Sequence, residues 1–198
     1  MKRIMGPAAA GRSTWSAGGI RYAGEFWFPA PVEDFWRTIE SFDSYRTWWP
    51  WLREFRTDNA GLVDGNVLRG TVVPPFPWPF RLEVRLHSCQ RLSVTKAELA
   101  GDVRGEAAMY FSEHDGGTRV RVVWTLFMVS APMRMAARVA RPLVLWGHDR
   151  VVEMTVAALR PRGVNAADNA ARSRADTKDG VEHRLREGEQ PSNETISR

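Results

Sequence analysis

The chain contains 198 residues, of which 26% are charged and 43% hydrophobic, and its formal net charge at pH 7 is +5. This length indicates one domain with tails. The arginines are spread along the predicted solvent faces of strands and helix, whereas a nucleic-acid site needs clustered basic residues with exposed aromatic ones, so we expect no nucleic-acid binding.

Cysteine and histidine content argues against a metal site. Cys89 is the only cysteine, which excludes an intrachain disulfide and a cysteine-based metal site and favours a reducing compartment. The four histidines have no metal-binding spacing, and no glycine-rich phosphate loop is present, so we expect no metal and no cofactor.

Targeting signals are also missing from the sequence pattern. Residues 1–19 lack the apolar run of a signal peptide, and arginines interrupt the most apolar helical stretch, so no segment resembles the roughly 20 residues that span a membrane. We expect a cytoplasmic protein without an integral membrane segment. Peripheral membrane contact stays open.

The first predicted elements are a strand and two short helical segments. Residues 1–19 are expected to form a flexible segment, and apolar residues then alternate from Tyr22 to Phe28, as in a strand with one face on a core. Pro31 suits the first turn of a helix. The aromatic-rich residues 41–52 predict a second short helix or turn.

About six antiparallel strands are expected next, from Glu54 onward, because turn residues recur at hairpin spacing. The last of them has the strictest pattern. Apolar side chains occupy the even positions from Val120 to Met128, while Arg119 and Arg121 take odd ones. One face of this strand is therefore predicted to lie on the core.

After Pro132 the period becomes that of an amphipathic helix, which we expect to run to Arg160 with a bend at Pro142. Small residues such as Ala136 and Gly147 lie on its apolar face. They leave room between helix and sheet, which points to a pocket. Residues 161–198 are polar and are expected to be a disordered tail.

Strands flanked by helices, without strand–helix alternation, predict an α+β fold with helices on one side of a curved antiparallel sheet. Several segments in this order resemble the START-like (SRPBCC) superfamily, within its polyketide cyclase/dehydrase and lipid-transport group. The segments are Pro31–Trp36, Trp48–Pro50, Gly101–Gly105, Gly117–Thr118 and Gly147–His148.

The resemblance covers residues 20–160 and implies one helix-grip domain: two short helices after the first strand, and a sheet wrapped around a long C-terminal helix. Such a fold would hold an apolar small molecule under that helix. Members of the superfamily include enzymes, carriers and proteins that contact other proteins, so the fold alone does not decide the function.

Cyclases and aromatases of this fold use polar groups inside the cavity to move protons. His148 would serve only if it turns inward, and Lys96 shares a phase with Leu92 and so points inside unless a bulge resets the register. Tyr110 is a third candidate. We expect no nucleophilic pair from His87 and Cys89.

The leading hypothesis is binding or transport of a hydrophobic small molecule (lipid, polyketide or aromatic metabolite), with little or no catalysis. Arg150 is expected to anchor acidic ligands. The expected ligand-binding residues are Trp49, Trp78, Phe80, Met109, Trp124, Leu126, Leu143, Gly147, Arg150 and Met154. Two alternatives stay open: a polyketide cyclase or aromatase, and a partner-binding protein with a filled cavity.

Overall fold

One antiparallel sheet and a C-terminal helix dominate the structure, a computed structural model that describes residues 11–75 and 78–160. The sheet order is β1-β2-β8-β7-β6-β5-β4-β3. The strands are β1 (Arg12–Ser16), β2 (Gly19–Phe28), β3 (Leu52–Thr57), β4 (Val67–Val72), β5 (Phe80–Gln90), β6 (Val94–Gly101), β7 (Val103–His114) and β8 (Gly117–Met128). The helices are α1 (Val32–Glu40), the 3-10 helix η1 (Phe42–Ser44), α2 (Tyr45–Trp48), α3 (Ala131–Val139) and the C-terminal helix (residues 141–160).

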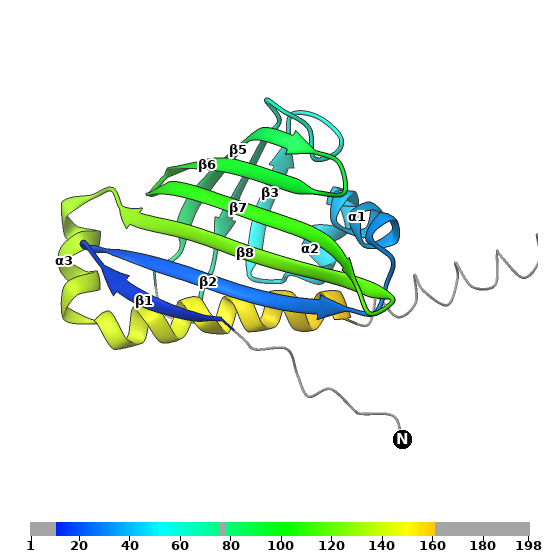
Figure 1. Ribbon diagram of the computed structural model, residues 1–198. Helices are drawn as coiled ribbons and strands as arrows, with labels where there is room; N and C mark the ends of the chain where they lie inside the picture. The colour runs from blue at the N-terminus through cyan, green and yellow to red at the C-terminus, as the bar shows by residue number, and fades with distance from the viewer. Residues whose placement is uncertain (1–10, 76–77, 161–198) are drawn as a thin grey trace, which may run out of the picture.

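The sheet curves around the C-terminal helix, with α1 and α2 at one end and α3 at the other (Figure 1). This arrangement confirms the predicted α+β helix-grip fold. The predicted tail at residues 161–198 lies outside the described residues, as do residues 1–10.

The alternating pattern of the last strand is confirmed. Val120 and Val122 of β8 are buried and Arg121 is exposed. At the start of the same strand Thr118 is fully buried, and its hydroxyl donates to the carbonyl of Ala30 at 2.7 Å. This bond ties β8 to the entrance of α1.

A strand that the sequence analysis did not predict, β1, lies within the N-terminal segment expected to be flexible. It pairs with β2 through a two-residue turn at Ala17 and Gly18, whose φ angles are 51° and 81°. Such turns favour Asn or Asp with Gly. Because alanine takes the first turn position here, the sequence lacked the usual signal of a hairpin turn.

The prediction of one bent helix is wrong. α3 ends at Val139, Ala140 leaves the helical conformation (φ −96°, ψ 26°), and a second helix begins at residue 141. Pro142 has no N–H and its ring clashes with the preceding turn, whereas in a first helical turn it costs no hydrogen bond. The helix is therefore interrupted before Pro142, and the chain turns sharply there (Figure 1).

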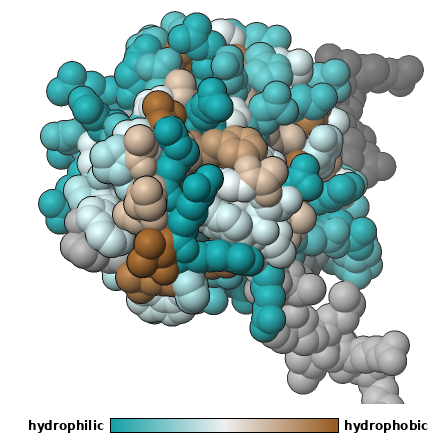
Figure 2. All heavy atoms as spheres, turned by 90° about the vertical axis from the view of Figure 1, so that its left-hand side faces the viewer, coloured by the Kyte–Doolittle hydropathy of each residue, from teal (hydrophilic) through white to brown (hydrophobic). Residues whose placement is uncertain are grey.

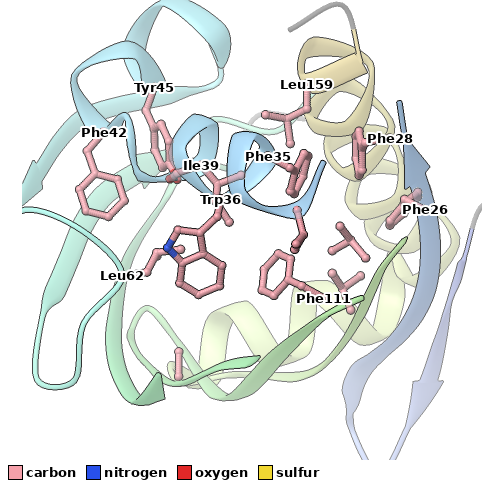
Figure 3. Packing of buried hydrophobic residues seen from close by; sticks show 14 of the residues in the cluster. Phe26, Phe28, Phe35, Trp36, Ile39, Phe42, Tyr45, Leu62, Phe111 and Leu159 are labelled. Carbon is pink, nitrogen blue, oxygen red and sulfur yellow. The ribbon is translucent and has the colours of Figure 1, made fainter. Parts of the chain in front are cut away.

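Aromatic side chains fill the interior at the α1 end, as Figure 3 shows. Phe35 and Trp36 of α1 are 2% and 1% exposed, and the Trp36 ring meets Phe111 of β7 edge-on at 5.1 Å between centroids. Leu159 of the C-terminal helix belongs to the same buried cluster. This end of the grip is a close-packed core.

Candidate functional site

A cavity of about 270 Å³ lies at the α3 end of the molecule, between the sheet and the helices. Nearly every described side chain on its wall is apolar. The wall consists of Ile20, Val72, Pro74, Trp78, Phe80, Val103, Leu126, Met128, Pro132, Met133, Ala136, Ala137, Val144, His148 and Val151. The site is thus suited to an apolar ligand.

Small side chains keep this end hollow. Ala136 and Ala137 of α3 face the interior at the α3 end. At the α1 end the corresponding space is filled by aromatic rings. A separate small cluster of Ile20, Ala137 and Val144 supports the wall, with exposed fractions of 3–6%. An alanine methyl reaches too short a distance to fill the gap between α3 and β8, so the space stays open.

His148 is the only titratable residue on the described wall. The Trp124 indole N–H donates to Nε2 of His148 at 2.8 Å, and Nδ1 lies 3.2 Å from Oδ1 of Asp149. An indole nitrogen only donates, so Nε2 accepts and the proton of the neutral imidazole sits on Nδ1, where it is donated to Asp149. Both ring nitrogens therefore have protein partners.

Neighbouring groups hold this network in place. The backbone N–H of Ser13 in β1 donates to the same Asp149 oxygen at 3.1 Å. The Tyr22 ring stacks on Trp124 at 4.5 Å between centroids and lies 5.3 Å from the His148 ring. The imidazole is thus fixed by contacts from two strands and its own helix.

Burial sets the charge state of the network. Desolvation lowers the pKa of His148, and the hydrogen bond and charge of Asp149 only partly oppose this. Burial, assisted by the Asp149 and Glu153 carboxylates, raises the pKa of Tyr22 to about 12. At neutral pH the His148 ring on the cavity wall is therefore uncharged, and so is the Tyr22 phenol behind it, which does not border the cavity.

The other two proton-transfer candidates lie away from the cavity. Tyr110 is 39% exposed on the outer face of β7. The prediction that Lys96 points inward is wrong: Thr95 and Ala97 are buried and Lys96 is exposed. Leu92 sits in a turn with φ 65°, and the β5–β6 register shifts beside it, which resets the phase of β6.

Three of the expected ligand-binding residues, Trp78, Phe80 and Leu126, border the cavity. Trp124 does not border the cavity, but its indole N–H donates to His148, which does. The rest lie elsewhere: Trp49 and Met109 in the aromatic core, Leu143 and Arg150 on the surface, Gly147 buried and Met154 half-buried beyond the wall.

Arg150 is not placed to anchor a cavity ligand. It is exposed, and its guanidinium pairs with Glu153 at 3.1 Å one helical turn away. Arg150 thus lies on the solvent face of the C-terminal helix, outside the cavity wall, and its role as an anchor stays a prediction.

The sequence analysis placed Ala136 beside a pocket but missed the other wall residues of α3, including Pro132 and Met133. These residues reach the cavity only because the helix breaks. A signal was present in the sequence: Ser130 caps α3 by accepting the N–H of Met133 at 3.3 Å, and a proline follows two residues after the cap. The same kind of proline at 142 marks a second helix start.

The described residues contain neither an activated cysteine nor a cluster of metal ligands. Burial, assisted by Asp64, raises the pKa of the Cys89 thiol to about 11, and its sulfur contacts the carbonyl rather than the ring of His87. No group of three potential metal ligands occurs in residues 11–75 and 78–160. Among the helices described, none is long and apolar enough to cross a membrane.

No known family profile and no curated protein match the chain. Solved structures do share its fold. The protein TTHA0849 from Thermus thermophilus has a TM-score of 0.60 at 19% identity, over 74% of this chain and 99% of that one. The Zhui aromatase/cyclase from Streptomyces sp. R1128 has a TM-score of 0.56 at 13% identity, over 72% and 92%.

A START superfamily protein from Mycobacterium smegmatis gives a TM-score of 0.54 at 15% identity, covering 73% of this chain and 97% of that one. Identities this low establish the fold alone. The chain therefore has the helix-grip fold of these START-like proteins, as the resemblance of its sequence segments implied.

Proposed function

We propose that the protein binds and carries a compact, uncharged hydrophobic molecule in the cavity beside α3. One observation supports this most directly: the described wall is apolar, and its only titratable side chain, His148, has both ring nitrogens bonded within the protein. Such a wall favours an apolar ligand over a charged one, because a buried charge without a partner is costly.

The cavity volume narrows the class of ligand. At about 270 Å³ the cavity exceeds the roughly 150 Å³ that accommodates a benzene ring and falls near the lower end of drug-sized pockets, about 300–1,000 Å³. A small aromatic ring system or a short acyl chain fits this space. A two-chain lipid would extend beyond it.

The lack of an available acid or base argues for carriage over catalysis. A general acid or base must reach the reacting proton within about 2.6–3.2 Å. Lys96 and Tyr110 lie on the outer face of the sheet, and His148 is occupied by Trp124 and Asp149. A ligand that enters the cavity therefore meets ring carbons and methyl groups.

A polyketide cyclase or aromatase is the second candidate, favoured by one observation: the His148 ring borders the cavity. Two solved proteins with this fold are named aromatase/cyclases. For this activity the bound substrate would have to take the place of the Trp124 N–H at Nε2. The third reading, a filled interior, is disfavoured by the cavity itself.

Native mass spectrometry of the purified full chain, followed by organic extraction, tests the proposal. We expect one apolar molecule per chain, or saturable uptake of small aromatic and acyl compounds without turnover. The Ala136→Leu variant should lose uptake because its side chain enters the cavity, while Ala131→Leu, on the exposed start of the same helix, should retain it. Chemical conversion of a bound polyketide, abolished by His148→Gln, would favour the cyclase instead.

A further inference from the structure

The outer face of α3 and the start of the C-terminal helix carry large exposed apolar side chains. Val139 is 81% exposed, Met135 65%, Trp146 53% and Leu143 41%. We name these four residues the α3 patch. Figure 2 views this end of the molecule and shows apolar atoms side by side with hydrophilic ones. Contiguous exposed apolar side chains commonly mark an interaction surface.

The charged residues of α3 and of the segments next to it in the sequence have one sign. Arg134, Arg138 and Arg141 are exposed, and residues 129–148 contain no aspartate or glutamate. Arg134 donates to the backbone carbonyl of Val129, which carries no charge that could neutralise the guanidinium. In the described ranges, none of the three arginines pairs with a carboxylate. The patch therefore offers three positive charges to a partner.

The α3 half of the patch and the cavity lie on opposite sides of the same short helix. Met133, Ala136 and Ala137 of α3 face the cavity, while Met135 and Val139 face outward. A partner on the α3 patch would thus sit one helix diameter from the bound ligand.

We propose that the α3 patch docks on the surface of an anionic lipid bilayer. The apolar side chains would enter the interfacial region, where Trp146 has a favoured position, and the arginines would contact headgroup phosphates. A second copy of the chain is a poorer occupant, because two such patches would bring six arginines together without an acid. This inference goes beyond ligand carriage, since docking does not require an occupied cavity.

The test is co-sedimentation of the full chain with two kinds of vesicle: pure phosphatidylcholine, and phosphatidylcholine with about one third phosphatidylglycerol. We expect binding to the anionic vesicles that is at least about tenfold stronger and weakens with added salt. The double variant Arg138→Gln/Arg141→Gln should lose most of this preference. Val139→Ser/Trp146→Ser should weaken binding to both kinds of vesicle.

Val63→Ser is the matched control, because Val63 is 47% exposed but lies outside the patch, and it should bind as the parent chain does. Circular dichroism would verify that each variant folds. Equal binding to both vesicles, no binding, or patch variants that bind like the parent would each overturn the proposal. So would a dimer in size-exclusion chromatography that Val139→Ser/Trp146→Ser converts to a monomer. Ligand uptake, measured without vesicles, distinguishes failure here from failure of the carrier function.

Discussion

The two ends of the helix grip share one sheet but differ in what lies beneath it. At the α1 end, Phe35, Trp36 and Phe111 close the interior, whereas at the α3 end Ala136 and Ala137 leave a cavity of about 270 Å³. The strands are continuous from one end to the other. The size of the inward-facing side chains therefore decides which part of the interior is core and which is a binding site.

The aromatic end has a cost of its own. The indole N–H groups of Trp36, Trp49 and Trp51 are buried and have no hydrogen-bond partner among the described residues. An unsatisfied buried donor typically costs about 1–3 kcal/mol. Close ring packing, such as Tyr45 against Trp49 at 4.2 Å between centroids, offsets this loss. Most of the buried aromatic packing thus lies at the end opposite the cavity.

The largest expected effect comes from truncation at the aromatic end. Trp36→Ala should lower the free energy of unfolding by about 3–5 kcal/mol, because it removes a fully buried ring from a filled core. Met133→Ala should cost less than half as much, because one side of Met133 already borders empty space. Equilibrium unfolding in urea measures both, and equal losses would contradict the comparison.

Trp36→Ala can fail to fold, so a milder pair keeps the comparison testable. Phe111→Leu at the aromatic end should cost about 1–3 kcal/mol. The corresponding change at the cavity wall, Phe80→Leu, should cost less, because Phe80 is only half-buried.

Adding side-chain volume should also affect the two ends differently: it should destabilise the filled aromatic end and be tolerated at the cavity end. Ala30→Leu, in the aromatic cluster, should lower the free energy of unfolding by about 1–3 kcal/mol through overpacking, because Ala30 is fully buried. Ala136→Leu should leave stability nearly unchanged and reduce affinity for an apolar probe at least about tenfold. Probe titration and urea unfolding of both variants measure this, and a large stability loss in Ala136→Leu would indicate a filled interior.

A smaller effect is expected at the cavity histidine. Trp124→Phe removes the N–H donated to Nε2 of His148, a bond that favours the neutral ring, so the pKa of His148 should rise, although burial still lowers it. Titration of the imidazole resonances by NMR would show it. Trp146→Phe, at an exposed tryptophan, is the control, and an unchanged His148 titration in Trp124→Phe would contradict the assigned tautomer.

The smallest effect is on the pH dependence of stability. Because the folded pKa of His148 is lowered, the unfolded chain binds the proton more readily, and stability should fall as pH drops below about 6.5 toward the folded pKa. Above that range this contribution is fully present. His148→Gln should show a smaller loss between about pH 7.5 and 5.5. Urea midpoints at the two pH values measure it, and identical losses would argue against a buried neutral imidazole.

Much of the fold was predictable because burial imposes a period on the chain. Val120 and Val122 in β8 alternate with exposed residues as expected, and Phe35 and Trp36 mark the buried stripe of α1. The β1 hairpin was not predictable, because Ala17 adopts a left-handed conformation that alanine rarely takes.

The site was predicted only in part. Strand residues such as Phe80 and Leu126 followed from alternation, since one face of each strand must point inward. Periodicity within one helix gives no information about where the chain breaks, so the wall formed by Met133 and Ala137 was missed. The partners of His148 come from β8 and from its own helix, and such contacts between distant segments depend on the tertiary fold.

Asp149 has a second consequence, which concerns the edge of the sheet. β1 is an edge strand, and an edge with open backbone groups can recruit another chain. Here the N–H of Ser13 is taken by Asp149 and the Ser13 hydroxyl reaches the carbonyl of Leu145 at 3.4 Å, so the helix covers this edge. One carboxylate thus both orients the cavity histidine and occupies a backbone N–H of the edge strand that an added strand would otherwise use.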